Sequence, residues 1–314
     1  MNSNSLDSFS VVRVSGGVGN QLFQLGFAYS LETQTGEPVY LDTVNYREGL
    51  EKLERRFVLG EILGSDERLI NSGNSLRHIL QKLESSRISA FINHNDEKFQ
   101  QSRYRDLKIT RQAPCVYDAE LSINPRSYFI GSFTSPQYWG QQKDTILQTV
   151  ADLVKGSYAN SNDFSTQEIG VLAIHARRGD YISNEKTNKI HGSYGLNYYI
   201  EAVRQLVDFG HIPSAITISS DSSDFSQDLA TKLGRQFRNI RIIDNENLQG
   251  LMLTLSGADY FIGSNSTFSW WVSHLRERKF SILPLNWFRG NSYHFDPNGY
   301  FLNRPFLLDF DFDI

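Results

Sequence analysis

Cysteine is almost absent from this chain of 314 residues, and Cys115 is the single example. One cysteine can form neither an intrachain disulfide nor a cysteine-rich zinc site. A chain without disulfides fits a reducing compartment. Residues 1–8 are polar and lack the apolar core of a signal peptide. We therefore expect a soluble, cytoplasmic protein.

Long apolar runs and a strong excess of charge are also missing. No apolar run approaches the ~20 residues that span a bilayer, although peripheral contact with a membrane stays open. The formal net charge is −4, whereas a general nucleic-acid-binding protein needs a basic face. With 39% hydrophobic and 21% charged residues, the chain can build a sizeable core. We expect no nucleic-acid partner.

Metal-binding motifs are scarce. The chain contains no His-Glu-x-x-His sequence and no paired cysteines. Residues 309–313 read Asp-Phe-Asp-Phe-Asp and include the Asp-x-Asp pair of many metal-dependent transferases. This pair does not follow a nucleotide-binding strand, and its alternation with phenylalanine favours an exposed edge strand or tail. We therefore expect no metal site.

Short β-rich runs alternate with helical patterns, which is typical of an α/β fold with parallel sheets. In the first half, we expect strands at residues 9–14, 38–42 and 128–133, and helices at residues 21–31, 75–83 and 144–154. In the second half, we expect strands at residues 171–174, 215–220, 240–243, 260–263 and 281–283, and helices at residues 196–209, 249–257 and from 268 towards 276. Residues 156–163 are polar and turn-rich. They divide the chain into two predicted domains, residues 1–160 and residues 161–314, with a cleft between them.

The segment from His175 to Asp180 directly follows the apolar run at residues 171–174. Open α/β sheets bind ligands at the carboxyl ends of their strands. Arg177 and Arg178 lie there, and the planar fork of a guanidinium can bond two phosphate oxygens at once. We therefore predict a phosphate-bearing ligand at the end of a central strand. His175 could instead be a hydrogen-bonded structural residue, and Arg178 and Asp180 could form an internal ion pair that orients Arg177.

Two further strand-to-helix turns are candidates for an anion site. Residues 16–21 read Gly-Gly-Val-Gly-Asn-Gln, and glycines let a backbone approach a ligand closely at a helix N-terminus. Residues 264–269 offer hydroxyls beside the unpaired N–H groups of a helix start. Each turn has a structural alternative, a tight glycine turn in the first and a multiply capped helix in the second. Leu22 breaks the dinucleotide fingerprint, which disfavours a dehydrogenase. The first turn is not a Walker loop either, because Gly-Lys-Ser/Thr is missing.

Asp221 directly follows the expected strand at residues 215–220. Its carboxylate could accept two hydrogen bonds from a ribose diol or from a guanine edge. It could also cap the following helix. Trp270 and Trp271 are expected to pack in the core rather than to form a platform for a sugar.

Several blocks in this order resemble the α-1,2-fucosyltransferases of glycosyltransferase family 11. Residues 175–181 are similar to the family's signature His-x-Arg-Arg-Gly-Asp-Tyr, and residues 16–24 to its N-terminal block. The other similar blocks are residues 128–133 with Tyr138, residues 196–199 and residues 265–271. Residues 43–115 match nothing in the family, and we expect part of an acceptor surface there.

The resemblance implies a GT-B fold, in which two Rossmann-like domains face each other and the second binds most of the donor. It implies inverting transfer of L-fucose from GDP-β-L-fucose to a galactose 2-hydroxyl of a glycan acceptor, without a required metal or other cofactor. Arginine then neutralises the diphosphate leaving group, a task that a divalent ion performs elsewhere. The resemblance also implies a role in polysaccharide or O-antigen biosynthesis, where a lipid-linked acceptor would bring the protein to a membrane.

On this chain, the resemblance assigns the β-phosphate contact to Arg177 and a structural or supporting role to Arg178. Asp180 is a candidate general base only if it points into the cleft and not at an arginine. The predicted donor-binding residues are His175, Arg178, Asp221, Asn265, Ser266, Thr267 and Ser269. The residues predicted to face the fucose or the acceptor from the first domain are Gly17, Gly19, Asn20 and Gln21.

Two other functions stay open at this point. The same fold could use a different sugar nucleotide as its donor. The chain could also be a carbohydrate- or nucleotide-binding protein that retains the pocket and turns nothing over.

Overall fold

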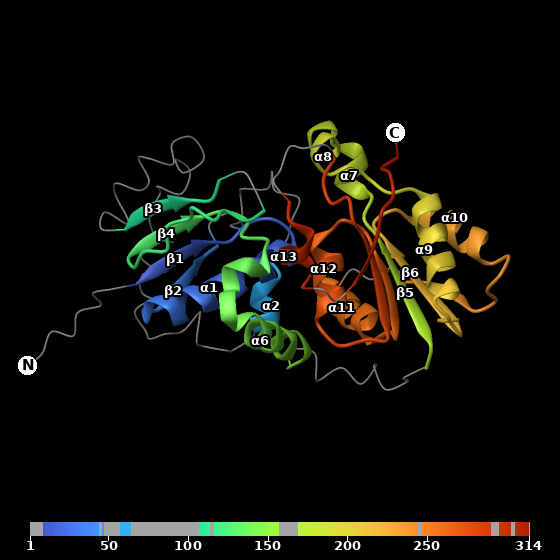
Figure 1. Ribbon diagram of the computed structural model, residues 1–314, viewed down its shortest axis with the longest axis horizontal. Coiled ribbons are helices and arrows are strands. Elements are labelled where there is room, and N and C mark those ends of the chain that lie inside the picture. Colours follow the sequence, from blue (N-terminus) through green and yellow to red (C-terminus); the bar gives the residue numbers. More distant parts are fainter. Residues whose placement is uncertain are drawn as a thin grey trace, which may run out of the picture.

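The computed structural model describes residues 9–43, 46, 57–63, 107–113, 116–156, 169–243, 247–289, 295–302 and 305–313. The predicted helix at residues 75–83 and nearly all of the predicted linker at residues 156–163 lie outside the described residues. Most of the segment at residues 43–115 lies outside them too. Within the described residues, the chain forms two parallel sheets that are covered by helices (Figure 1).

The second sheet has the strand order of a dinucleotide-binding Rossmann domain. Its order is β10-β9-β8-β5-β6-β7, and its pairs are parallel. The strands are β5 (Val171–Ala176), β6 (Ala215–Ser220), β7 (Ile240–Ile242), β8 (Tyr260–Gly263), β9 (Phe280–Pro284) and β10 (Phe306–Leu308). The order reverses between β5 and β8, and ligands of such sheets bind outside the carboxyl ends at this switch point.

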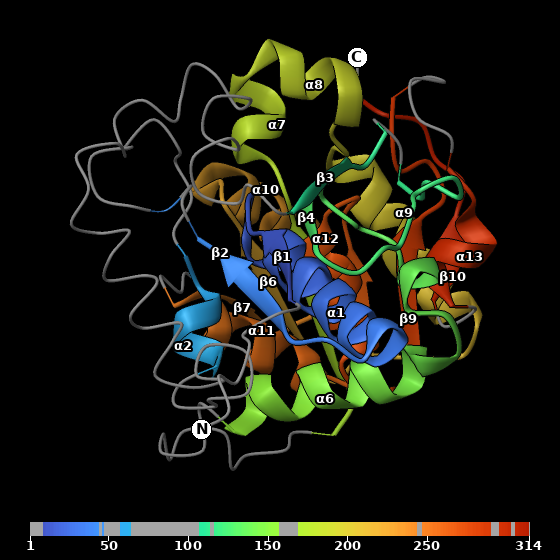
Figure 2. The same cartoon turned by 90° about the vertical axis from the view of Figure 1, so that its left-hand side faces the viewer.

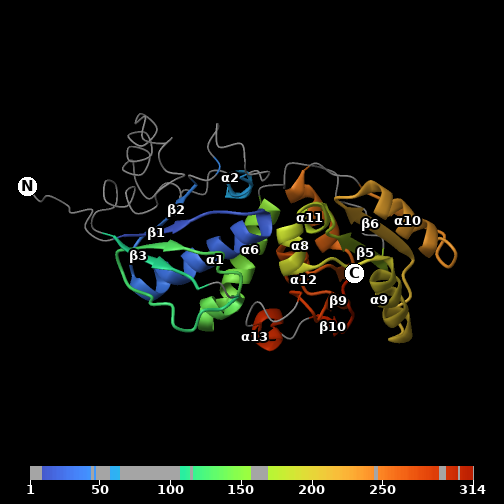
Figure 3. The ribbon, with the colours of Figure 1, turned by 90° about the horizontal axis from the view of Figure 1, so that it is seen from above.

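Helices cover both faces of the second sheet, which is why β5 is buried along its whole length. They are α7 (Gly179–Ser183), α8 (Glu185–His191), α9 (Leu196–Asp208), α10 (Ser223–Leu233), α11 (Leu248–Gly257) and α12 (Thr267–His274). α9 and α10 cover the outer face, whereas α11 and α12 lie between the two sheets (Figures 1 and 3). α7 and α8 lie beyond the carboxyl end of β5. The even-numbered residues of β5 therefore face α9, and His175 faces α12.

The first sheet has the order β2-β1-β4-β3, again with parallel pairs. Its strands are β1 (Ser10–Arg13), β2 (Val39–Asp42), β3 (Lys108–Arg111) and β4 (Ser127–Ile130), and its helical segments are α1 (Val18–Thr35), α2 (Leu59–Leu63), η3 (Pro136–Gln142) and α6 (Lys143–Gly156). α1 begins earlier than predicted, because Gly17 is its N-cap. β4 ends earlier than predicted, and Phe133 has a φ of 47°, which no strand residue adopts.

The two halves share one hydrophobic core. Its centre is an aromatic cluster in which every ring belongs to a residue that is at most 1% exposed: Phe23 and Trp139 from the first half, and Trp270, Trp271 and Tyr300 from the second. The ring of Phe23 lies 4.6 Å from that of Trp270 and 5.1 Å from that of Trp271. The prediction that both tryptophans pack in the core is confirmed.

A glycine lets α1 approach α12. A Cβ on Gly19 would lie 2.5 Å from the carbonyl carbon of Thr267 and 2.6 Å from the nitrogen of Phe268. In addition, Nε1 of Trp271 donates a hydrogen bond to the carbonyl oxygen of Gly19 at 2.9 Å. The backbone at Gly19 is therefore in close contact with a helix of the second domain. Figure 2 shows α1 in front of α12, seen from the side of the first domain.

Two parallel-sheet domains that face each other form the GT-B arrangement, as predicted. The prediction that β9 is the last strand is wrong, because β10 pairs with it in parallel; three residues are too few to show a periodic pattern. Between these two strands, α13 (Pro297–Phe301) packs against η3 of the first half. The predicted boundary at residue 160 lies outside the described residues. No helix of the described segments is long and apolar enough to cross a membrane.

Gly19→Ala should destabilise the protein by about 1–3 kcal/mol, because the added methyl group has no room against Thr267. Gly257→Ala is the matched control. Gly257 ends α11 and has open space around its Cβ position, so alanine should be neutral or slightly stabilising there. The free energy of unfolding in urea measures both effects. Equal stability of the two variants would contradict the packing role of Gly19.

Candidate active site

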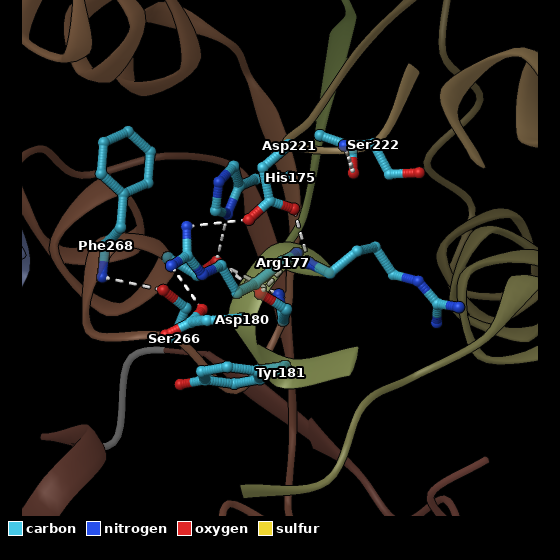
Figure 4. A network of polar contacts seen from close by, with 12 residues as sticks. His175, Arg177, Asp180, Tyr181, Asp221, Ser222, Ser266 and Phe268 are labelled. Atoms are coloured by element: carbon cyan, nitrogen blue, oxygen red, sulfur yellow. Dashed lines mark hydrogen bonds and ion pairs between the residues drawn. The ribbon is translucent and has the colours of Figure 1, made fainter. Parts of the chain in front are cut away.

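Hydrogen bonds join the turns that follow β5 and β8 at the switch point. The N–H of Arg177 donates to Oγ of Ser264 at 3.3 Å, and the N–H of Ser264 donates to Oγ of Ser269 at 3.2 Å. Oγ of Ser269 also lies 2.7 Å from Nδ1 of His175. These contacts fix the end of β5 against the start of α12, and they place His175 and Arg177 side by side (Figure 4).

Arg177 presents a partly exposed guanidinium at this point. Its side chain is 31% exposed, with Nη2 at 2.6 Å from Oδ1 of Asp180 and Nη1 at 2.8 Å from Oδ2 of Asp221 (Figure 4). Burial disfavours the charged guanidinium, but the carboxylates of Asp221 and Asp180 raise the pKa of Arg177 above its usual value. The result is a permanent, oriented cation that solvent can still reach.

Asp180 points at Arg177, so the condition set for a general base is not met in this structure. The alternative ion pair of Arg178 with Asp180 is wrong, because Asp180 pairs with Arg177 itself and orients it directly. Tyr181 follows Asp180 on α7. Its ring lies 5.8 Å from the guanidinium carbon of Arg177, and its hydroxyl donates to the carbonyl oxygen of Asn265 at 3.2 Å.

The guanidinium of Arg178 occupies a socket in the protein, formed by Phe225, Ser193, Tyr194 and Asp313. Its guanidinium lies 4.5 Å from the ring centre of Phe225. Nη1 donates to Oγ of Ser193 at 3.1 Å and to the carbonyl oxygen of Tyr194 at 2.8 Å, and it lies 3.5 Å from Oδ2 of Asp313. These contacts correspond to the structural role that the sequence suggests for Arg178.

Asp221 links the two arginines. Its Oδ1 accepts a hydrogen bond from the N–H of Arg178 at 2.6 Å, while Oδ2 pairs with Arg177. A Cβ on Gly179 would lie 2.7 Å from Oδ2, so only glycine leaves room for this carboxylate. The alternative that Asp221 caps the next helix is wrong, because the cap of α10 is Ser222. Contact of Asp221 with a ribose or a guanine stays a prediction.

His175 is a buried, neutral imidazole. Burial lowers its pKa from 6.5 to about 4, and the negative charge of Asp221 offsets only part of this effect. Its ring packs on Phe268, with 4.7 Å between the ring centres. At pH 7 the ring of His175 therefore carries no positive charge, and its contact with a donor stays a prediction.

The turn before α12 uses most of its side chains within the protein. Oγ of Ser266 accepts from the N–H of Phe268 at 3.3 Å, as expected for a helix cap. Nδ2 of Asn265 donates to the carbonyl oxygens of His191 at 2.7 Å and Trp287 at 3.1 Å. Its buried Oδ1 has no hydrogen-bond partner among the described residues. Ser266 is thus the residue of this turn that caps α12, rather than one of several caps, and phosphate binding by this turn stays a prediction.

The glycine-rich turn of the first domain reaches the second domain through Asn20. Oδ1 of Asn20 accepts from Oγ1 of Thr267 at 2.8 Å. Gln21 is fully buried instead: its Nε2 donates to the carbonyl oxygen of Gly16 at 3.0 Å, and its Oε1 accepts from the N–H of Val58 at 2.9 Å. Gly17 is the N-cap of α1. The structure therefore brings Asn20 to the domain seam, whereas Gln21 holds the first domain together.

Ser264 and Tyr181 belong to the site, although the sequence assigned neither of them a role in binding the donor. Ser264 directly follows β8, and this position at a switch-point strand was a signal that the sequence offered. Tyr181 is the last residue of the family-like block at residues 175–181, but only the packing of α7 brings its hydroxyl to Asn265. Among the residues that the structure describes, no group of three or more His, Cys, Asp or Glu side chains could hold a metal ion.

Comparisons with known proteins agree with this arrangement. A sequence model of the family described as Glycosyl transferase family 11 matches residues 10–293. The chain is 24% identical over 298 residues to an alpha-1,2-colitosyltransferase of Escherichia coli. This match covers 92% of this chain and 96% of that protein. It is 26% identical over 311 residues to the O-antigen biosynthesis glycosyltransferase WbnK of Escherichia coli. This second match covers 89% of this chain and 95% of that protein.

Among solved structures, that of POFUT1 in complex with GDP-fucose is similar at 12% identity and a TM-score of 0.43, covering 90% of this chain and 98% of that chain. The two-domain fold and the family match define a glycosyltransferase of the GT-B type. Specifically, the chain belongs to glycosyltransferase family 11.

The buried His175 should make the protein less stable in acid. The unfolded chain takes up a proton below pH 6.5, whereas the folded protein does so only near pH 4. Stability should therefore fall as the pH drops from about 6.5 to about 4, by about 3 kcal/mol from this group. His175→Gln should remove this part of the slope in urea unfolding at a series of pH values.

His211→Gln is the control, because His211 lies in the loop between α9 and β6, away from the switch point. This variant controls for the general effect of replacing a histidine by glutamine. A His175→Gln variant with the wild-type slope would show that the imidazole protonates freely in the folded protein.

Proposed function

We propose that this protein transfers L-fucose from GDP-β-L-fucose to a hydroxyl of a glycan acceptor, with inversion at the sugar carbon and with galactose O2 as the acceptor atom. The observation that carries the proposal is the guanidinium of Arg177, which is oriented by two carboxylates and still 31% exposed at the switch point. In an open α/β sheet, this is the position at which a nucleotide ligand binds.

The leaving group explains why a cation is needed there. As the bond between fucose and GDP breaks, negative charge develops on the β-phosphate. Arg177 stabilises this charge, and its positive charge is present before the reaction begins. The N-terminus of α12, which Ser266 caps, adds partial positive charge on the same side. In this proposal the reaction needs no metal ion.

The acceptor approaches from the side of the first domain. Its hydroxyl attacks the sugar carbon from the face opposite GDP in a single displacement. Besides Gly19, Asn20 of the first domain contacts the start of α12, through a hydrogen bond of its side chain with Thr267. We propose that Asn20 faces the fucose or the acceptor, while Asp180 acts by orienting Arg177 rather than as a general base.

A colitosyl donor is the second candidate. It is favoured by the relative named alpha-1,2-colitosyltransferase, which matches 92% of this chain. Colitose lacks one hydroxyl of fucose, and a site that hydrogen-bonds this hydroxyl would discriminate strongly between the two donors. The O-antigen relative supports a surface glycan as the acceptor class.

GDP should raise the melting temperature of the protein, whereas UDP and ADP at the same concentration should not. Arg177→Ala should abolish this shift and lower the transfer rate from GDP-fucose by ~10²–10³-fold. Arg204→Ala is the control, since Arg204 is an exposed arginine on α9 that pairs with Glu201 and Asp208. It should behave like the wild type. Equal melting shifts with all three nucleotides would argue against a GDP-sugar donor.

Transfer should continue in EDTA at the rate measured without it, because Arg177 supplies the positive charge. The same assay, run by mass spectrometry with GDP-fucose, GDP-colitose and UDP-galactose, identifies the donor. Fucose transfer that stops in EDTA and returns with manganese would overturn the metal-free mechanism. Binding of GDP-fucose with neither transfer nor hydrolysis would indicate a non-catalytic binding protein.

A further inference from the structure

The Asp-Phe-Asp-Phe-Asp motif at residues 309–313 has no part in the donor chemistry described above. It follows β10 and is not itself a strand, so the sequence-based alternative of an edge strand is wrong and that of a tail is right. Its three aspartates are exposed, whereas its two phenylalanines are partly buried. Alternation with a two-residue period places the two kinds of side chain on opposite sides of an extended segment. One side of this segment therefore packs on the protein.

The phenylalanines pack on the segment that joins α8 to α9 and on α9 itself. The ring of Phe312 lies 4.7 Å from that of Tyr194, and the ring of Phe310 lies 5.8 Å from that of Tyr198. The N–H of Asp313 donates to the carbonyl oxygen of Ser193 at 3.0 Å. Side chains and backbone thus hold the motif against α9 and against the loop at residues 192–195 that precedes it.

This loop is shaped to receive the motif. Gly192 has a φ of +64°, and a Cβ there would lie 2.5 Å from Cδ1 of Phe312. A Cβ on Gly195 would lie 2.1 Å from Oδ2 of Asp313. Any other residue at either position would push the motif away.

The same loop forms the socket of Arg178. Two of the three oxygens that accept from Nη1 of Arg178 belong to residues 193–194, and the third is Oδ2 of Asp313 at 3.5 Å. The backbone N–H of Arg178 donates to Asp221, and Asp221 pairs with Arg177. A continuous line of contacts therefore runs from the motif to the guanidinium at the switch point.

We propose that Phe312 and Asp313 are positioning residues of the active site, which fix the place of Arg177 by holding the loop at residues 192–195 around Arg178. Neither residue touches the donor in this proposal, which rests on the role proposed for Arg177. Displacement of a charged group by about 1 Å can cost 10²-fold in rate, so a loosened socket has a measurable effect.

Phe312→Ala tests the proposal, with Asp311→Asn as the matched control. Asp311 lies in the same motif, but its side chain is exposed. Phe312→Ala should weaken GDP binding at least tenfold, as measured by calorimetry. It should also lower kcat for transfer from GDP-fucose at least tenfold. Both are measured at a temperature where circular dichroism shows a folded protein. Asp311→Asn should stay within twofold of the wild type. Phe312→Leu restores apolar bulk and should recover most of the loss.

A double-mutant cycle separates positioning through Arg178 from general damage. Arg178→Met removes the guanidinium that occupies the socket. The double variant with Phe312→Ala should lose little more GDP affinity and kcat than Arg178→Met alone, because both changes act along one line of contacts. If Phe312→Ala does not fold, Asp313→Ala takes its place in the same cycle. Losses that add fully, or a folded variant within twofold of the wild type, would overturn the proposal.

Failure of the proposed function would look different. In that case the wild-type protein would not bind GDP at all. Amide hydrogen exchange in the ligand-free protein then still tests whether Phe312 positions the residues around Arg177. Phe312→Ala should speed exchange at least tenfold in residues 177–183 and 192–195 and leave β9 unchanged, and unchanged exchange in residues 177–183 would overturn it.

Discussion

The ion pairs of Arg177 with Asp180 and Asp221 are the interaction on which the whole site depends. Two carboxylates fix the direction of one guanidinium and keep it charged, so the cation is in place before any ligand arrives. They also leave this cluster of three groups with a net negative charge. A diphosphate must therefore gain further stabilisation elsewhere, and the N–H groups at the start of α12 lie on the same side of the sheet.

The seam between the domains gives this cluster a rigid support. Phe23 packs on Trp270 and Trp271, and Gly19 brings the start of α1 against the start of α12. Large, fully buried aromatic side chains resist displacement, because opening the seam would expose their apolar area to water. The first domain thus presents Asn20 to the second at a fixed place, and preorganisation of this kind favours electrostatic catalysis.

Much of the fold was predictable from the sequence. The strand at residues 215–220 and the helices α6, α9 and α11 were predicted nearly as the structure has them, since their apolar patterns are strong and local. β10 and the helices α7 and α8 were missed. They are short, and their positions depend on contacts with distant segments, such as that of Arg289 with Ile190.

The sequence by itself determined that two arginines follow a buried strand and that a phosphate is the ligand they suit. The order of residues could not say which guanidinium is enclosed by protein and which stays partly exposed, since adjacent residues of an extended chain point to opposite sides. Only the tertiary structure decided this, by placing Phe225 and the loop at residues 192–195 around Arg178 and two carboxylates around Arg177. The partners that fix each guanidinium come from segments up to 135 residues away, and no local pattern encodes such distances.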